Sequence, residues 1–383
     1  MAHFLVPRHI FTGKNALAES MPDLRECGQR ALLVTGPHIG KSPMMDTLKK
    51  NLALAGISAA VFDRITGEPT VRMIEDGVGA YRHNSCDFVI GLGGGSPLDA
   101  AKAISYMCVS TGKLTDYRGQ IPEKEIPPVA AIPTTAGTGS EVTKFTIITD
   151  EEQNIKMLMK GDCLIPRIAV VDPAFTVDMP KSVTAATGLD ALTHAVEAYT
   201  SVKATPLTDA LAISAVKRIM KYLPAAYSRG CDAKAREEMS VAALEAGICI
   251  NNSSVTIVHG MSRPIGALFH VPHGLSNAML LRECLDFAKS GAIKRFADLS
   301  HATGAALQDD SDDAAAARFI YQIGVILTVC EVPTLREYGV DRADYEAAIE
   351  KMAADAIASG SPGNTGRPVS REDCIAIYRR IYM

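Results

Sequence analysis

The sequence lacks several features that would assign a protein to a membrane or to nucleic acid. No apolar run approaches the roughly 20 residues that cross a bilayer, and the N-terminal residues lack the basic head and apolar stretch of a signal peptide. Basic residues are not in excess, since the net charge is −4, whereas nucleic acid and anionic membranes need a basic face. We therefore expect a cytoplasmic protein with a small-molecule partner, and with neither nucleic acid nor membrane.

Cysteine pairing motifs are also missing. The nine cysteines are scattered along the chain and none forms a Cys-x-x-Cys pair. This distribution argues against a zinc ribbon and against a disulfide framework. Free thiols in a reducing compartment fit it best.

No internal repeat, heptad or low-complexity tract divides the chain, so its organisation must come from length and periodicity. A chain of 383 residues suits two domains. In the first half, short apolar runs typical of buried strands alternate with helical spacing, which predicts a parallel sheet covered by helices. After about residue 178 the strand-like runs vanish, which predicts an all-helical second half. The predicted strands are residues 31–36, 87–91, 128–132 and 168–171, and the first predicted helices are residues 41–56 and 71–82.

A glycine cluster follows the strand predicted at residues 87–91. Gly94, Gly95 and Ser96 open a helix there, and Asp99 lies one turn further on. Glycine lets a phosphate approach the main chain, and a helix N-terminus carries a partial positive charge. The alternative is a tight turn from strand to helix, in which glycine only allows a backbone conformation with positive φ.

A second polar loop follows the next predicted strand. Thr134, Thr135 and Thr138 offer hydroxyl groups suited to a ribose or a phosphate, although a capped loop would have a similar composition. Two loops that follow neighbouring parallel strands meet at one edge of the sheet, where open α/β sheets bind their ligands. The pattern favours a dinucleotide site in residues 1–180.

The second half contains a possible metal site. Asp190 and His194 are spaced i, i+4 in a segment of helical composition, so both side chains leave the same helix face. His259 and His273 lie beside glycines in apolar surroundings, and a buried imidazole needs a partner. One oxygen and three nitrogens make a plausible ligand set. Two alternatives stay open. Such a pair can be an ordinary polar contact, and His270 competes with His273 for the last position because their i, i+3 spacing would place both on one helical face.

Four segments together carry a family resemblance: GGGSPLDAAKA, PTTAGTGSEVT, GLDALTHAVEAYT and HGMSRPIGALFHVPHGLSNAMLL. The chain resembles the iron-containing (group III) alcohol dehydrogenases, a group that includes lactaldehyde reductase and 1,3-propanediol dehydrogenase, over essentially its whole length. The resemblance implies a Rossmann-like α/β domain at residues 1–180 and an all-helical metal-binding domain at residues 181–383, as in the dehydroquinate-synthase-like fold.

The resemblance also implies roles for single residues. It assigns the metal to Asp190, His194, His259 and His273, which excludes His270. The implied cofactor-binding residues are those of the two loops, together with a lysine further along: Gly94, Gly95, Ser96, Asp99, Thr134, Thr135, Thr138 and Lys156.

Two positions depart from the family pattern. Many NAD-specific members carry an acidic residue where this chain has Gly36, so nothing obvious repels the 2′-phosphate of NADP, and NAD or NADP is expected. Arg263 replaces a histidine that several members place near the nicotinamide and the metal. Since a guanidinium is no general base near neutral pH, protons would travel through water and ribose, or Arg263 would bind an anionic substrate, or it would make a structural contact.

The predicted protein is a metal-dependent oxidoreductase, and no separate catalytic base is assigned, because none is visible in the sequence. It would transfer a hydride between a small primary alcohol or diol, or its aldehyde, and NAD(P), while the metal polarises the substrate oxygen. Fe(II) is the implied metal, and the same donors also suit zinc. A homodimer or higher homo-oligomer is expected. The alternative is an NAD- and metal-dependent lyase resembling dehydroquinate synthase on the same fold.

Overall fold

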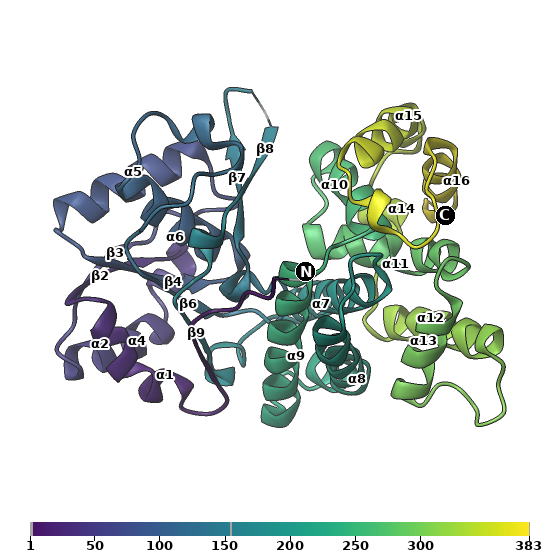
Figure 1. The fold of residues 1–383 in the computed structure, drawn as a ribbon, viewed down its shortest axis with the longest axis horizontal. Coiled ribbons are helices and arrows are strands. Elements are labelled where there is room, and N and C mark those ends of the chain that lie inside the picture. The colour runs from purple at the N-terminus through teal and green to yellow at the C-terminus, as the bar shows by residue number, and fades with distance from the viewer. Residues whose placement is uncertain (1–2, 154, 383) are drawn as a thin grey trace. The chain divides into compact units, whose positions relative to one another are not determined.

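The chain folds into two compact units, and the computed structural model describes residues 3–153 and 155–382 (Figure 1). The first unit spans Phe4–Met179, and the second begins at Pro180. Every strand of the described chain lies in the first unit, and the second is built from helices. The α/β and all-helical architectures predicted from the sequence are confirmed.

A six-stranded parallel sheet forms the centre of the first unit, with the strand order β1-β9-β6-β4-β2-β3. The four inner strands are the four that the apolar runs predict. The two edge strands are missed, because an edge strand needs no continuous apolar run; most of β3, for example, is exposed. The strands are β1 (His9–Thr12), β2 (Arg30–Val34), β3 (Ser58–Phe62), β4 (Phe88–Gly93), β6 (Val129–Pro133) and β9 (Ile168–Val171).

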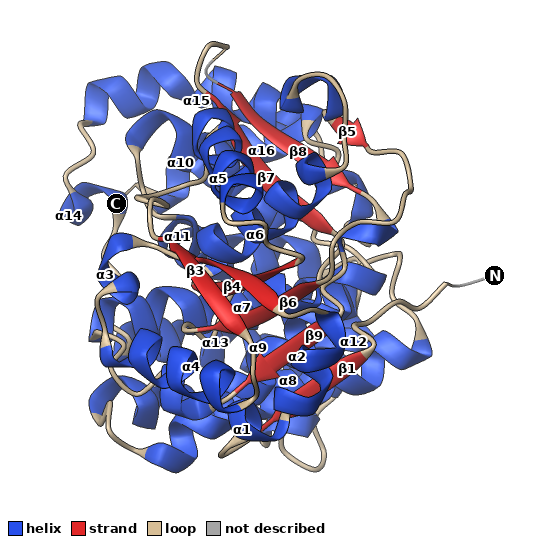
Figure 2. Ribbon diagram, turned by 90° about the vertical axis from the view of Figure 1, so that its left-hand side faces the viewer, coloured by secondary structure: helices blue, strands red, loops and turns tan. Residues whose placement is uncertain are grey.

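Helices cover both faces of this sheet, as Figure 2 shows for α5 and α6 on one side and for α2 and α4 on the other. Successive residues of β2 point to opposite faces, so Leu32 packs in a core with α5 and α6, whereas Leu33 packs in a second core with α1, α2 and α4. The helices are α1 (Ala16–Glu19), α2 (Met21–Cys27), α3 (Pro37–Gly40), α4 (Pro43–Leu54), α5 (Val71–His83) and α6 (Gly95–Cys108).

A small sheet with the order β5-β8-β7 completes the first unit and was not predicted from the sequence. Its strands β7 and β8 are antiparallel neighbours, and only alternate residues are buried, so their pattern lacks the continuous apolar run of the main sheet. These strands are β5 (Gly119–Gln120), β7 (Phe145–Asp150) and β8 (Ile155–Lys160).

Ten α-helices make up the second unit, and its described residues contain no strand beyond an isolated bridge between Ser201 and Thr365. The helices α7, α8 and α9 pack against one another, and α11 packs on α7. They are α7 (Lys181–Thr200), α8 (Pro206–Ser228), α9 (Ala233–Asn252), α10 (Ile257–Phe269), α11 (His273–Lys289), α12 (Ile293–Thr303), α13 (Asp312–Val329), α14 (Leu335–Tyr338), α15 (Arg342–Ala358) and α16 (Arg371–Ile381).

Within the described residues, no individual helix has the length and apolar character of a membrane span. The successive helices α9 and α10 pass that test only when taken together, and they are bent by 101° where they meet.

Candidate functional site

Helix α7 is enclosed by protein along most of its length. A helix buried on all sides is expected to be apolar all round, yet α7 buries Asp190, His194 and Glu197. Buried charges are unfavourable unless they are paired or coordinate a metal. These three side chains therefore indicate a polar site inside the helical unit.

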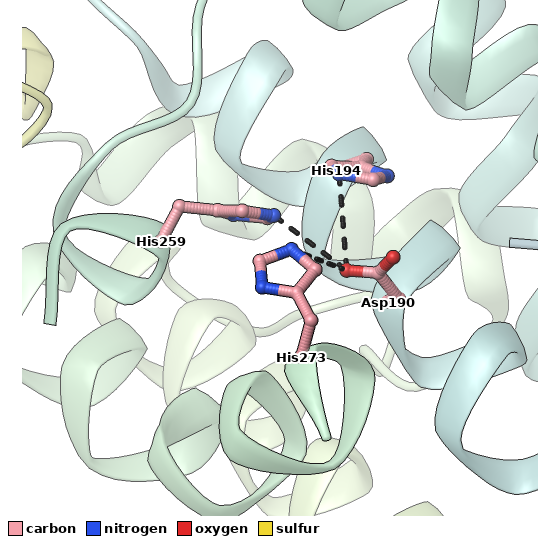
Figure 3. A group of neighbouring side chains, drawn as sticks. All are labelled: Asp190, His194, His259 and His273. Atoms are coloured by element: carbon pink, nitrogen blue, oxygen red, sulfur yellow. Dashed lines mark ion pairs between the residues drawn. The ribbon is translucent and has the colours of Figure 1, made fainter. Parts of the chain in front are cut away.

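Four side chains from three helices meet at this site (Figure 3). Asp190 and His194 come from successive turns of α7, His259 from the first turn of α10, and His273 from the first residue of α11. One carboxylate oxygen and one nitrogen of each ring lie within 4.8 Å of one another. Asp190 Oδ1 is 3.8 Å, 3.6 Å and 3.7 Å from the Nε2 atoms of His194, His259 and His273.

These separations suit one divalent cation. Tetrahedral ligands about 2.0–2.1 Å from an ion lie about 3.4 Å apart, close to the distances from the Asp190 oxygen to the three ring nitrogens. One carboxylate and three imidazoles are donors that iron, zinc and nickel all accept. The donor set fits the metal that the family resemblance implies.

His270, the rival for the fourth position, does not belong to this cluster. The spacing suggested that His270 and His273 share a helical face, but that premise is wrong. His270 ends α10 in the left-handed conformation, with φ 55°, and is exposed, whereas His273 begins α11. The chain turns between the two histidines, so no common face exists.

Glu197 holds His259 in place. Its Oε2 lies 2.6 Å from His259 Nδ1, and its Oε1 accepts hydrogen bonds of 2.7 Å from the Thr256 hydroxyl and from the Val258 N–H. Because Nδ1 faces this carboxylate, Nε2 of the same ring faces the centre. A carboxylate behind a histidine in this way fixes the ring and raises its basicity as a metal ligand.

The charges of the site shift the pKa values of its members. Burial alone would lower the pKa of His259, but Glu197 and Asp190 outweigh it and raise the pKa to about 9. Burial would likewise raise the pKa of Asp190, yet the surrounding histidines, led by His194, hold it well below its usual range. The carboxylate is therefore ionised at neutral pH and available to a cation.

Asn277 is a further residue that the sequence pattern does not single out. It lies one turn after His273 on α11, is fully buried, and has its Nδ2 2.7 Å from Asp190 Oδ1. The same nitrogen is 3.1 Å from His259 Nε2 and 3.2 Å from His273 Nε2. Asn277 thus contacts three members of the cluster and helps to hold their ligand atoms together.

The centre is open on one side within its own unit. The side chains of Asp190, His194 and His259 are 3%, 6% and 4% exposed, whereas that of His273 is 45% exposed. A small molecule can therefore approach the cluster beside His273.

Arg263 lies next to the cluster. It follows His259 by one turn of α10, so the two side chains share a helix face. Its Nη1 donates a hydrogen bond of 3.2 Å to the Ser361 hydroxyl. Desolvation lowers the pKa of His273, Asp190 opposes this, and the positive charges of His259, His194 and, least of these, Arg263 lower it further.

The two polar loops of the first unit pack against each other. Gly94 caps α6, and a side chain at Gly94 would meet the Thr135 methyl group at 3.4 Å. A side chain at Gly95 would meet the Thr138 methyl group at 3.0 Å, which is tighter than most such contacts. The Thr134 N–H donates to the Gly93 carbonyl at 2.9 Å. A larger residue at Gly95 would therefore crowd the second loop, whereas one at Gly94 would make an ordinary contact with it. Ser96 lies in the first turn of the helix.

Asp99, on α6, connects this helix to the segment that follows the second loop. Its Oδ1 accepts a hydrogen bond of 2.5 Å from the Ser140 hydroxyl, and its Oδ2 accepts one of 2.9 Å from the Ile147 N–H. Lys102, which is fully buried, donates to Ser140 and to Thr143 at 2.9 Å and 3.0 Å. Both carboxylate oxygens of Asp99 thus have protein partners, so its visible role is to anchor the second loop.

The two remaining predicted cofactor residues lie at other points of the first unit. Lys156, on β8, forms an ion pair of 2.6 Å with Glu68 and is partly exposed. Gly36 caps α3 just after β2, and a side chain there would meet the carbonyl oxygen of Ile65 at 2.9 Å. The close approach of this carbonyl gives Gly36 a packing reason besides any role in cofactor choice.

Comparison with known proteins gives matches over both units. A sequence model described as "Iron-containing alcohol dehydrogenase" matches residues 7–173, and one described as "Fe-containing alcohol dehydrogenase family, C-terminal" matches residues 184–382. The NAD-dependent methanol dehydrogenase of Bacillus methanolicus is 35% identical over 365 residues, which cover 94% of this chain and 96% of that protein.

Two further comparisons extend over the full length. The 1,3-propanediol dehydrogenase of Klebsiella pneumoniae is 35% identical over 387 residues, covering 100% of this chain and 99% of that protein. The crystal structure of a 1,3-propanediol oxidoreductase superposes with a TM-score of 0.96 at 34% identity, with 100% of each chain covered.

Proposed function

The chain belongs to the iron-containing alcohol dehydrogenase family and is an oxidoreductase that acts on alcohols, and from this premise we propose the residues, cofactor and substrates with which it works. The substrates are small primary alcohols or diols and the corresponding aldehydes. Relatives named for methanol and for 1,3-propanediol support this size class.

The metal is held by Asp190, His194, His259 and His273. The convergence of one carboxylate and three imidazoles within 4.8 Å is the observation that carries this assignment. When bound, the ion supplies a Lewis acid for the substrate oxygen, and the nicotinamide supplies the hydride acceptor or donor. Fe(II) is the metal expected from the family, and zinc suits the same donors.

The protein residues position these groups. Asp190 contributes the negative charge that a cation needs, and Glu197 fixes the ring of His259 through Nδ1. The partly exposed side of His273 leaves room for the substrate oxygen. No side chain of the site is assigned as a separate general base.

The cofactor is NAD or NADP, bound by the α/β domain at residues 1–180. Gly94, Gly95 and Ser96 would receive the diphosphate at the start of α6, where backbone N–H groups and the helix dipole favour an anion. The other proposed contacts are Asp99, Thr134, Thr135, Thr138, Lys156 and Gly36. A relative named as NAD-dependent supports a nicotinamide cofactor.

The remaining proposals concern the whole protein. The helical domain, residues 181–383, would carry the metal, and the protein would work in the cytoplasm as a homodimer. Nine free cysteines are consistent with a reducing compartment. Light scattering tests the oligomeric state.

The lyase alternative differs in the reaction that it predicts. A dehydrogenase oxidises 1,3-propanediol in the presence of NAD or NADP and accumulates NADH or NADPH, whereas a lyase of the dehydroquinate synthase type shows no net cofactor reduction. The experiment is a spectrophotometric assay at 340 nm with protein loaded with Fe(II) or Zn(II), with both cofactors. Turnover that persists in protein shown to contain no metal would refute the metal assignment.

A further inference from the structure

Arg263 differs from the structural arginines of the same unit. Arg236, for comparison, is 1% exposed, and its guanidinium donates to the Gly230 carbonyl and to the Thr184 hydroxyl, both at 2.8 Å. Arg263 remains exposed and donates a hydrogen bond to the Ser361 hydroxyl. A guanidinium has five N–H donors, so most of the donors of Arg263 are available to another molecule.

The two buried carboxylates of the centre are engaged elsewhere. Both oxygens of Glu197 are bound by His259, Thr256 and Val258, and Asp190 Oδ1 faces the metal cluster and Asn277. Among the described residues, no ion pair includes Arg263. Its positive charge therefore has no carboxylate of its own.

The charge balance of the centre points in the same direction. A divalent ion would be balanced by the two carboxylates, Asp190 and Glu197. The charge of Arg263 then remains uncompensated about one helical turn from His259. An anion is favoured beside such a cation, and the interaction is strongest when the pair is partly shielded from water.

We propose that Arg263 is a specificity-determining residue that binds a carboxylate or sulfonate group of the substrate. The natural substrate is then a short aldehyde, or its alcohol, with the anionic group a few bonds from the reacting carbon. A guanidinium donates two parallel hydrogen bonds to such a group, which fixes its orientation as well as its position. This inference rests on the proposed function, because it names the substrate class of the same site.

The experiment compares two aldehydes of similar size, succinic semialdehyde as the anion and pentanal as the neutral probe. In the metal-loaded wild type, kcat/KM is expected to be higher for succinic semialdehyde. Arg263→Gln removes the charge and should reduce kcat/KM for the anion by roughly 10- to 150-fold, while pentanal changes less than threefold. Arg342→Gln, at an exposed ion pair on α15, is the matched control and should change neither.

Two further variants separate recognition from folding. Arg263→His introduces the residue that several family members carry there, is largely uncharged at pH 8, and should reproduce the loss for the anion. Arg263→Lys retains the charge without the planar fork and should recover part of it. Losses of kcat/KM in equal proportion for the two aldehydes would overturn the proposal. A wild-type enzyme that prefers pentanal, with the same preference in Arg263→His, would overturn it as well.

A binding measurement keeps this result independent of turnover. Butyrate carries the carboxylate but no aldehyde group, so calorimetric titration of the metal-loaded protein measures anion binding without turnover. The proposal is supported if the affinity for butyrate falls at least tenfold in Arg263→Gln and also falls at high salt. It is refuted if wild type and variant bind butyrate with equal affinity. A wild-type protein that turns over neither pentanal nor 1,3-propanediol would instead refute the proposed function.

Discussion

Glu197 and Asn277 show what a single buried polar residue contributes to the metal centre. An acidic residue three positions after His194 resembles an ordinary helix surface in the sequence. In the structure Glu197 is fully buried behind His259, and Asn277 lies among the ligand atoms. Both residues act by holding ligands in place, since neither is one of the four donors.

Replacing Glu197 tests this role. Glu197→Gln keeps the size of the side chain but removes the charge that faces His259 Nδ1, so the metal dissociation constant should rise about 10- to 100-fold. Competition with a chromogenic chelator measures it in the isolated protein. Glu346→Gln, at an exposed helix position, is the control. An unchanged dissociation constant in a folded Glu197→Gln protein would show that Glu197 has only a packing role.

Glu141 provides a prediction on pH. Burial raises its pKa to about 7 from the ordinary value of 4.5. Below pH 4.5 the carboxyl is protonated in both states; between pH 4.5 and 7 the unfolded chain loses the proton first, so the stability that Glu141 contributes falls as pH rises.

Glu141→Gln removes the titrating carboxyl group. The variant should therefore gain stability relative to wild type between pH 4.5 and 7, by about 1–3 kcal/mol. Urea midpoints of both proteins across this range measure the difference. A difference that stays constant with pH would show that Glu141 titrates in the folded protein as it does in the unfolded chain.

At the scale of elements, the two proposed cofactor loops depend on a buried lysine of the first motif to which the sequence pattern assigned no role. Lys102 extends from α6 to Ser140, Thr143 and the Phe145 carbonyl. It therefore connects the helix that begins at one loop with the segment that follows the other. Removing one partner of a buried charged network leaves the rest without compensation.

Lys102→Met should loosen the second loop. We expect a loss of about 2–4 kcal/mol in the stability of the first unit, together with faster amide exchange at residues 134–145 and weaker cofactor binding. Hydrogen exchange followed by mass spectrometry checks the loop directly. Lys49→Met, on the exposed face of α4, is the control. Exchange rates that match this control would refute a tethering role.

At the scale of the whole molecule, the proposed metal ligands all belong to the helical unit, whereas the proposed cofactor loops belong to the α/β unit. A ligand stabilises the part of a protein that binds it, by mass action. The two units should therefore respond to different additions.

Metal removal tests this division. Dialysis against a chelator should abolish turnover and lower the melting temperature of the helical unit, and Fe(II) or Zn(II) should restore both. Tryptic fragments identified during heating show which unit opens first. His259→Ala should behave like the stripped protein, without recovery on adding metal at concentrations that restore the wild type. A melting curve unaffected by chelation would argue against a metal bound by this unit.

The sequence by itself determined the parts of the protein that depend on local pattern. Continuous apolar runs predicted the inner strands of the main sheet, and helical spacing predicted α4, α5 and the helical second half. The edge strand β3 and the β7–β8 pair were missed, because a half-exposed strand is defined by the neighbour that it pairs with.

Only the tertiary structure decided how the polar residues are used. The spacing of His270 and His273 left two candidates, and the turn between α10 and α11 separates them. Glu197 gained its role because burial makes an unpaired charge unfavourable and His259 is the partner within reach. Periodicity records which face of a helix is apolar, whereas contacts between distant helices depend on packing, and packing decides which buried polar groups meet.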